Sequence, residues 1–203
     1  MSGDAGQTVL LYGAVIAGLL FLAFAFFAVA QAGTVRNGGQ TAADAAALGA
    51  AEDDRQQLFD GFLDTLDDEK GRDDEEGRQE WLDAVAPLSG DGCGAAAHFA
   101  DRNRSDLLSC DPVSREGDDG YRVSIETRFD TGDTIIPGTD NKTAKATATA
   151  VIRPRCETGD TENTTNAAEE IELVCGGEEL TIDPEDGGRD LKPSDLFSVV
   201  LVE

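Results

Sequence analysis

Basic residues are scarce in this chain: 16 Lys and Arg stand against 41 Asp and Glu, for a net charge of −25. A surface of this sign repels phosphate backbones, which argues against nucleic acid as a partner. Histidine occurs once, at His98, and the chain has no G-x-S-x-G elbow, phosphate-binding loop or HExxH helix. We therefore expect neither an enzyme nor a bound cofactor.

Charge is absent altogether from Thr8–Ala32. As a helix this stretch reaches about 37 Å at about 1.5 Å per residue, against a hydrocarbon core of about 30 Å. Only a helix satisfies every backbone group within one segment in lipid, so we predict a tail over 1–7 and a retained transmembrane helix over 8–32. A cleaved signal peptide is the alternative, since Ala28-Val29-Ala30 before Gln31 fits a small-residue cleavage site. The tail has no Lys or Arg, however, and the apolar run exceeds the roughly 7–15 residues of a secretory h-region.

Small residues recur within this apolar stretch. Gly13 pairs with Ala17 and Ala14 with Gly18, both at small-xxx-small spacing. Such pairs let a second helix approach closely, which predicts association with other subunits or with a second copy of the chain. The alternative is that Gly and Ala are simply common in membrane helices.

The chain has 4 cysteines and no CxxC pair. Pairing in sequence order, Cys93 with Cys110 and Cys156 with Cys175, closes two loops of similar size, each stabilising by about 3 kcal/mol in the loop-entropy model. Other connectivities stay open, and zinc is the alternative, although finger-like spacing is missing. We expect two disulfides and an oxidising compartment for the C-terminal region. Arg36 alone favours the opposite orientation under the positive-inside rule.

Residues 33–66 combine a helix-weakening cluster with a helical pattern. Asn37-Gly38-Gly39 predicts a hinge at the membrane surface, and Ala42–Ala51 has high helix propensity with little bulk. Whether the helices on either side of the cluster are continuous is left open. One face is marked by spacings of three and four residues, at Leu48, Arg55, Leu58, Phe59, Phe62, Leu63 and Leu66.

For residues 67–203 we predict an extracytoplasmic α+β domain. Short helices are expected over Gln79–Val85, with Trp81, Leu82 and Val85 inward, and over Ala95–Arg102. Period-two alternation then predicts strands over 121–129, 143–156, 170–175, 179–183 and 197–202, the middle pair joined by Gly176-Gly177. Strands with turns and no helices between them favour an antiparallel sheet. The acidic stretches 67–80 and 183–190 are expected to be a solvated loop and a turn, with calcium binding as the alternative.

The Gly-Gln pair before the apolar stretch, VRNGGQTAADAAALGAA directly after it, and IIPGTDNKTAKATATAVIRPRC later in the chain form a recognisable combination. Over residues 6–51 and 135–156 the chain resembles the TadG-like (TadE/TadG) pilus-assembly family of high-GC Gram-positive bacteria. The resemblance implies a single-pass envelope protein that assembles with other pilus or secretion-apparatus subunits. One feature departs from prepilin processing, which favours Glu five residues after the cut: a cut after Gly6 places Leu11 there, and a cut after Gly3 places Thr8 there. The resemblance therefore implies a minor, pseudopilin-like or purely anchored role.

Overall fold

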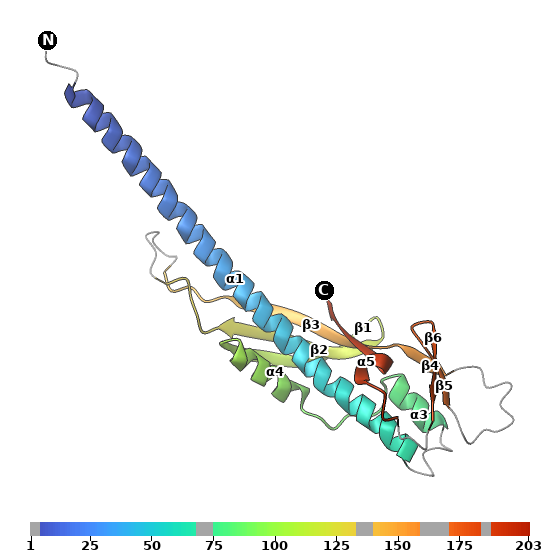
Figure 1. The fold of residues 1–203 in the computed structure, drawn as a ribbon. Coiled ribbons are helices and arrows are strands. Elements are labelled where there is room, and N and C mark those ends of the chain that lie inside the picture. Colours follow the sequence, from blue (N-terminus) through green and yellow to red (C-terminus); the bar gives the residue numbers. More distant parts are fainter. Residues whose placement is uncertain (1–4, 68–74, 133–139, 159–170, 184–187) are drawn as a thin grey trace.

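A single helix, α1 (Ala5–Asp67), dominates the architecture. The computed structural model describes residues 5–67, 75–132, 140–158, 171–183 and 188–203. With 63 residues, α1 is about 95 Å long at about 1.5 Å per residue. Its N-terminal half projects away from the rest of the chain, whereas its C-terminal half lies along a β-sheet (Figure 1).

The remaining elements form a domain around the second half of α1. In chain order they are α3 (Glu75–Leu82), α4 (Gly92–Arg102), β1 (Ser105–Arg115), β2 (Asp118–Thr127), β3 (Lys145–Pro154), β4 (Cys156–Thr158), β5 (Ile171–Cys175), β6 (Glu178–Ile182), α5 (Pro193–Leu196) and β7 (Phe197–Val202). All strand pairs are antiparallel. The fold class is therefore α+β, as the sequence predicts.

The main sheet has the strand order β1-β2-β3-β7. Helix α1 packs on β2, β3 and β7, and α4 lies beside α1 and contacts β1. Both helices therefore cover the same face, and the domain has two layers (Figure 1). On β2 the inward side chains alternate as predicted, and Val123 and Ile125 lie opposite Ala148 and Ala146 on β3. On β3 the predicted alternation fails over 148–152, because Thr149 and Val151 are buried as well.

The interface between α1 and the sheet is built from alanine. Six alanines on α1 are fully buried: Ala42, Ala43, Ala46, Ala47, Ala50 and Ala51. Without bulky side chains, the helix axis lies close to the sheet, and the alanines pack on the domain itself. Further along, the predicted apolar face is seen at Leu58, Phe59, Phe62 and Leu66, all buried. The prediction misplaces one position: Asp54 is buried, whereas Arg55 is only half-buried and pairs with Glu52.

The predicted hinge at Asn37-Gly38-Gly39 is wrong, because α1 continues through it without interruption. The glycines serve close packing there. A Cβ on Gly38 would lie 2.7 Å from Cζ of Phe129, and one on Gly39 would lie 3.1 Å from the Cβ of Ala144. Contact with the strand ends thus offsets a helix-propensity cost of about 1 kcal/mol per glycine.

Two further glycines of α1 receive aromatic rings in the same way. The ring of Phe99 from α4 covers Gly49, and the indole of Trp81 from α3 covers Gly61. Together with Phe129 against Gly38, three rings from three different elements dock on glycines of one helix. The glycines are therefore the positions at which aromatic side chains of the domain pack directly on α1.

The short helices lie near their predicted positions. Leu82 of α3 is buried as predicted, but Val85 follows the helix and is exposed. In α4, the Asp91 side chain caps the helix by accepting a hydrogen bond from the backbone N–H of Gly94, at 2.8 Å.

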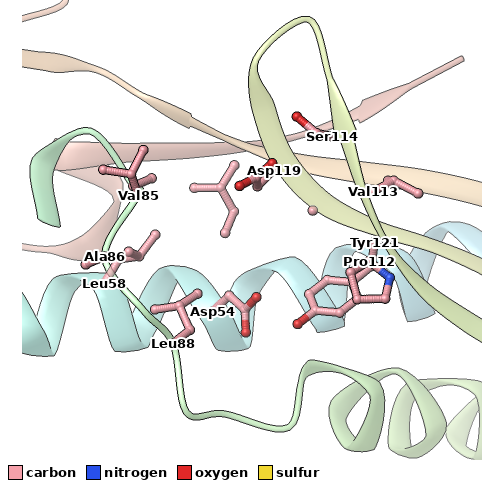
Figure 2. A pocket seen from close by; sticks show the side chains of 13 residues that line it. Asp54, Leu58, Val85, Ala86, Leu88, Pro112, Val113, Ser114, Asp119 and Tyr121 are labelled. Atoms are coloured by element: carbon pink, nitrogen blue, oxygen red, sulfur yellow. The ribbon is translucent and has the colours of Figure 1, made fainter. Parts of the chain in front are cut away.

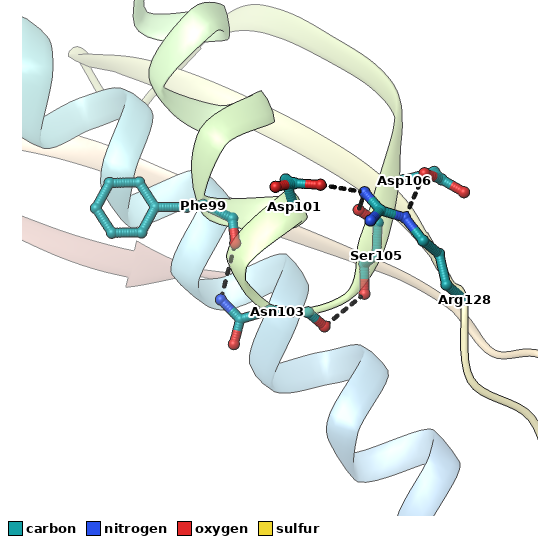
Figure 3. Close-up of polar contacts among 6 residues, drawn as sticks. All are labelled: Phe99, Asp101, Asn103, Ser105, Asp106 and Arg128. Atoms are coloured by element: carbon teal, nitrogen blue, oxygen red, sulfur yellow. Dashed lines mark hydrogen bonds and ion pairs between the residues drawn. The ribbon is translucent and has the colours of Figure 1, made fainter.

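The passage from α4 to β1 is fixed by polar contacts (Figure 3). Asn103 donates from its side chain to the Phe99 carbonyl at 2.8 Å, and Ser105 donates to the Asn103 carbonyl at 3.2 Å. Arg128, the residue after β2, pairs with both Asp101 and Asp106, each at 2.7 Å. One guanidinium thereby ties the end of α4 to the first residues of β1.

Strand β1 is absent from the sequence prediction. It pairs with β2 through a turn at Glu116-Gly117, where φ is 57° and 100°. Pro112 lies within β1, and proline is confined to edge strands because it cannot donate to the ladder. The strand order places β1 at an edge, which accounts for the proline.

The second sheet, β4-β5-β6, contains the predicted hairpin. Its disulfide, Cys156–Cys175, joins two residues that lie opposite each other on β4 and β5. The other disulfide, Cys93–Cys110, joins α4 to β1. The cysteines therefore pair in sequence order, and none of them is left for zinc.

Candidate functional site

The N-terminal half of α1 is an uncovered apolar surface. Among the described residues, α1 is the one helix long and apolar enough to cross a membrane. The large apolar side chains from Val9 to Val29 are each more than half exposed. An exposed apolar surface of this size is unfavourable in water. It therefore suggests that this half of α1 is anchored in a membrane.

The small residues predicted for helix association lie within this surface. Gly13, Ala14, Ala17 and Gly18 are all exposed, and a Cβ added at Gly13 or Gly18 would meet nothing within 4 Å. No other described part of the chain packs on them. The stripe is therefore open to a second helix.

A second feature, far from the uncovered apolar half of α1, is a pocket of about 370 Å³ between α1 and the β1–β2 hairpin. Asp54 and Leu58 of α1 form its floor, and the segment after α3 contributes Val85 and Leu88 (Figure 2). Its lining residues are Asp54, Leu58, Ala84, Val85, Ala86, Leu88, Pro112, Val113, Ser114, Asp119, Gly120, Tyr121 and Ile152. Counting along α1, Asp54 lies about 33 Å beyond Ala32.

Two polar side chains face each other in this pocket. The Tyr121 hydroxyl donates a hydrogen bond to the Asp54 carboxylate, while Asp54 Oδ1 has no partner among the described residues. Burial raises the pKa of Asp54 above its ordinary value; the Tyr121 hydrogen bond opposes this, and the nearby Asp53 charge adds to it. Burial, then the hydrogen bond to Asp54, raise the pKa of Tyr121, which stays a neutral donor.

Sequence reasoning missed this pocket. Asp54 stands in the run Glu52-Asp53-Asp54 and looks like one more solvated charge. The signal was its spacing: it follows Ala50 by one helical turn and precedes Leu58 by another, so it lies on the buried stripe. Tyr121 lies in the strand that the sequence predicts over 121–129.

The other candidate residues carry no site that the structure describes. Residues 68–74 and 184–187, which are half of each acidic stretch, lie outside the described residues, so calcium binding there stays a hypothesis. Within the described ranges, no group of three or more His, Cys, Asp or Glu side chains is placed to hold a metal ion. His98 is exposed and meets the edge of Phe99, with ring centroids 5.7 Å apart.

Comparison of the chain with protein-family models, with curated proteins and with solved structures found no match.

Proposed function

We propose that this protein is a membrane-anchored structural or assembly subunit of a tight-adherence (Flp/Tad-type) pilus or a related secretion apparatus. Its role is minor and pseudopilin-like, and its C-terminal domain lies outside the cytoplasm. The observation that carries the proposal is the continuity of α1: the helix with the uncovered apolar half is also the core helix of the domain. Any neighbour that binds the anchor therefore sets the position of the whole domain.

The anchor has the surface that such a role requires. Lipid tails are as apolar as leucine, so helices associate in a bilayer through close packing of small residues. The open stripe formed by Gly13, Ala14, Ala17 and Gly18 offers that packing. The sequence resemblance of residues 6–51 to TadG-like proteins supports a partner from the same apparatus.

The two disulfides support the orientation. Disulfides persist in oxidising compartments and are rare where thiols are kept reduced. The described cysteines are all paired. The opposite orientation is favoured by one basic residue near the anchor, Arg36, which is weaker evidence than the two disulfides.

The proposal is tested by crosslinking in membranes of the native organism, followed by identification of the crosslinked proteins. Ala17→Leu fills the small-residue stripe, and Ala23→Leu makes the same change about 150° around the helix from the centre of the stripe. We expect pilus-apparatus subunits to be captured by the unchanged chain and by Ala23→Leu. Capture by Ala17→Leu should fall about tenfold, which corresponds to a loss of about 1.4 kcal/mol.

Equal capture by the two variants would show that the stripe is not the contact. Recovery of the chain alone, or of its own dimer alone, would contradict the proposed assembly role.

A further inference from the structure

The two edge strands of the main sheet are built differently. At one edge, β1 contains Pro112, two aspartates and a shift of register between Leu107 and Ser109. Proline, charged side chains and bulges are the devices by which native sheets prevent an edge from pairing with a further strand. At the other edge, β7 has none of them: its sequence is FSVVLV, and its register with β3 is unbroken along its whole length.

The side chains of β7 are those of an enclosed strand. Successive side chains of a strand point to opposite faces of the sheet, yet four consecutive residues of β7 are apolar: Val199, Val200, Leu201 and Val202. A short apolar run without alternation is typical of a fully buried strand. Each of the four has a neighbour on β3, but no described strand lies on the opposite side of β7 (Figure 1). Leu201 is accordingly 45% exposed.

The outer edge of β7 also has free backbone groups. In an antiparallel ladder, alternate residues direct their N–H and C=O groups to opposite sides, so part of the groups of β7 point away from β3. Among the residues that the structure describes, none forms a backbone hydrogen bond with 198–202 apart from those of β3. The space at the C-terminal end of the strand is open, since a hollow of about 570 Å³ is lined by Leu201 and by Gln40 of α1. An extended backbone is the partner that matches such an edge.

The direction of α1 limits which chain can supply this backbone. Gly39 of α1 lies against Thr127, the last residue of β2, whereas Asp54 is hydrogen-bonded to Tyr121 near the start of that strand. The helix therefore runs antiparallel to β2. Because β2 and β7 are both antiparallel to β3, the helix also runs antiparallel to β7. The apolar half of α1 and the direction of β7 are thus fixed relative to each other.

A second copy of the chain does not fit this edge. Two β7 strands that pair antiparallel are related by a two-fold axis perpendicular to the strands, which reverses α1. The two apolar halves would then point to opposite sides and could not enter the same membrane. A two-fold axis along the strands keeps the direction of α1 but places equivalent side chains on opposite faces at one level of the ladder, against the pleat. The β1 edge of another copy runs in a suitable direction, but its proline, charges and register shift oppose pairing.

We propose that an extended segment of a different protein pairs with the outer edge of β7 and adds a fifth strand to the four-stranded main sheet. The segment matches the 6 residues of β7 in length and carries β-branched or aromatic side chains beside Val199–Val202. It carries no Asp or Glu beside Glu203, because like charges directly opposite each other destabilise a sheet. The proposal rests on the membrane anchoring of α1. It adds a contact outside the membrane to the helix contact of the proposed function.

The test is the binding of a short uncharged peptide to the full chain in nonionic detergent micelles. The probe is acetyl-Ser-Val-Thr-Val-Thr-Val-Ser followed by a short polyethylene glycol chain for solubility. The control is the same peptide methylated at every central backbone nitrogen, which keeps the side chains and removes the N–H donors. We expect saturable binding of the probe in isothermal titration calorimetry and slower hydrogen exchange at the amides of β7. The control should produce neither effect.

Two matched variants locate the contact. Leu201→Lys places a charge on the edge and should raise the Kd of the probe at least about tenfold. Val174→Lys makes the same change at a position that is 39% exposed on β5, the inner strand of the second sheet, and should leave the Kd unchanged. The proposal fails if the probe shows no saturable binding, if the methylated peptide binds as strongly, if protection from exchange lies outside β7, or if the two variants bind equally.

Photo-crosslinking in membranes of the native organism identifies the source of the strand. p-Benzoylphenylalanine in place of Leu201 should crosslink to a segment of a different protein, and the same group in place of Val174 should not. A crosslink between two copies of the chain from the first position would overturn the assignment to a different protein. Ala17→Leu, which fills the small-residue stripe, should leave the Kd of the peptide unchanged. Failure of the helix contact and failure of strand pairing are therefore distinguished.

Discussion

A carboxylate at a core-facing position of a helix lowers stability unless a partner compensates it. Asp54 occupies such a position, between the buried alanines and Leu58 of α1. The Tyr121 hydroxyl compensates it in part, and Oδ1 of Asp54 is buried without a partner among the described residues. Residues kept at a cost in stability are concentrated at functional sites.

The free energy of unfolding should depend on pH through Asp54. Its pKa is raised in the folded state, mainly by burial, from an ordinary value of 3.8. The folded state therefore binds this proton more tightly than the unfolded state does. Its stabilising effect is complete below about pH 3.8 and is lost as the pH rises through the folded value. Asp54→Asn removes that loss, so it should raise Tm at pH 7 and make no difference at the acid end.

Thermal unfolding of the full chain in micelles from pH 3 to pH 8 measures this effect. Each kcal/mol corresponds to about 2–4 °C for a chain of this length. Exposed Asp64→Asn is the matched control and should follow the unchanged chain. A lower Tm for Asp54→Asn at pH 7 would show that the charged form of Asp54 stabilises the fold.

At the scale of elements, α1 is held by aromatic rings that dock on glycines. Phe99 covers Gly49, which is buried, whereas a Cβ at Gly33 of the same helix would meet nothing within 4 Å. Gly→Ala gains about 1 kcal/mol of helix propensity at either position. At Gly49 the added methyl group must displace the Phe99 ring, and overpacking costs about 1–3 kcal/mol.

The two substitutions should therefore differ in sign. Gly49→Ala should lower the free energy of unfolding by about 1 kcal/mol, and Gly33→Ala should leave it unchanged or raise it. Denaturant unfolding in micelles measures both. In the background of Phe99→Ala, Gly49→Ala should no longer destabilise, because the ring that it displaces is gone. A stabilising Gly49→Ala in the unchanged chain would contradict the docking role of this glycine.

Most of the elements could be predicted from the sequence because their residues obey one period. The apolar run of Thr8–Ala32, the alternating strands and the final strand Phe197–Val202 are of this kind. The continuity of α1 could not be predicted, since Gly38 and Gly39 weaken a helix locally and only contacts with Phe129 and Ala144 show their role. Strand β1 escaped prediction because Pro112 and its acidic residues break the pattern, which only an edge position permits.

The two candidate sites also differ in how far the sequence predicts them. The open stripe of small residues in the apolar half of α1 depends on spacing within one helix, so the sequence alone shows which residues share that stripe, and their role in association stays a prediction. The pocket brings together α1, the segment after α3 and the β1–β2 hairpin. One of those elements was missing from the prediction, and the single sign of the pocket was a polar residue on a buried stripe.

For the molecule as a whole, the two disulfides link the stability of the domain to the redox state of its compartment. They span 17 and 19 residues in loops that do not overlap, so their effects on the unfolded chain should add. The loop-entropy model assigns each about 3 kcal/mol. Their sum of about 6 kcal/mol is comparable to the whole stability of a typical domain, about 5–15 kcal/mol.

Replacing Cys93 and Cys110 by Ser should therefore lower the free energy of unfolding by about 3 kcal/mol, and replacing all four cysteines by about 6 kcal/mol. Denaturant unfolding of the full chain in micelles, followed by Trp81 fluorescence, measures each step. Reduction of the unchanged chain should reproduce the fourfold variant, which separates loss of the crosslinks from the effect of the new hydroxyl groups. If the fourfold variant were as stable as the unchanged chain, the domain would fold equally well in a reducing compartment. The disulfides would then no longer support an extracytoplasmic position, and the orientation would rest on Arg36, which favours the cytoplasm.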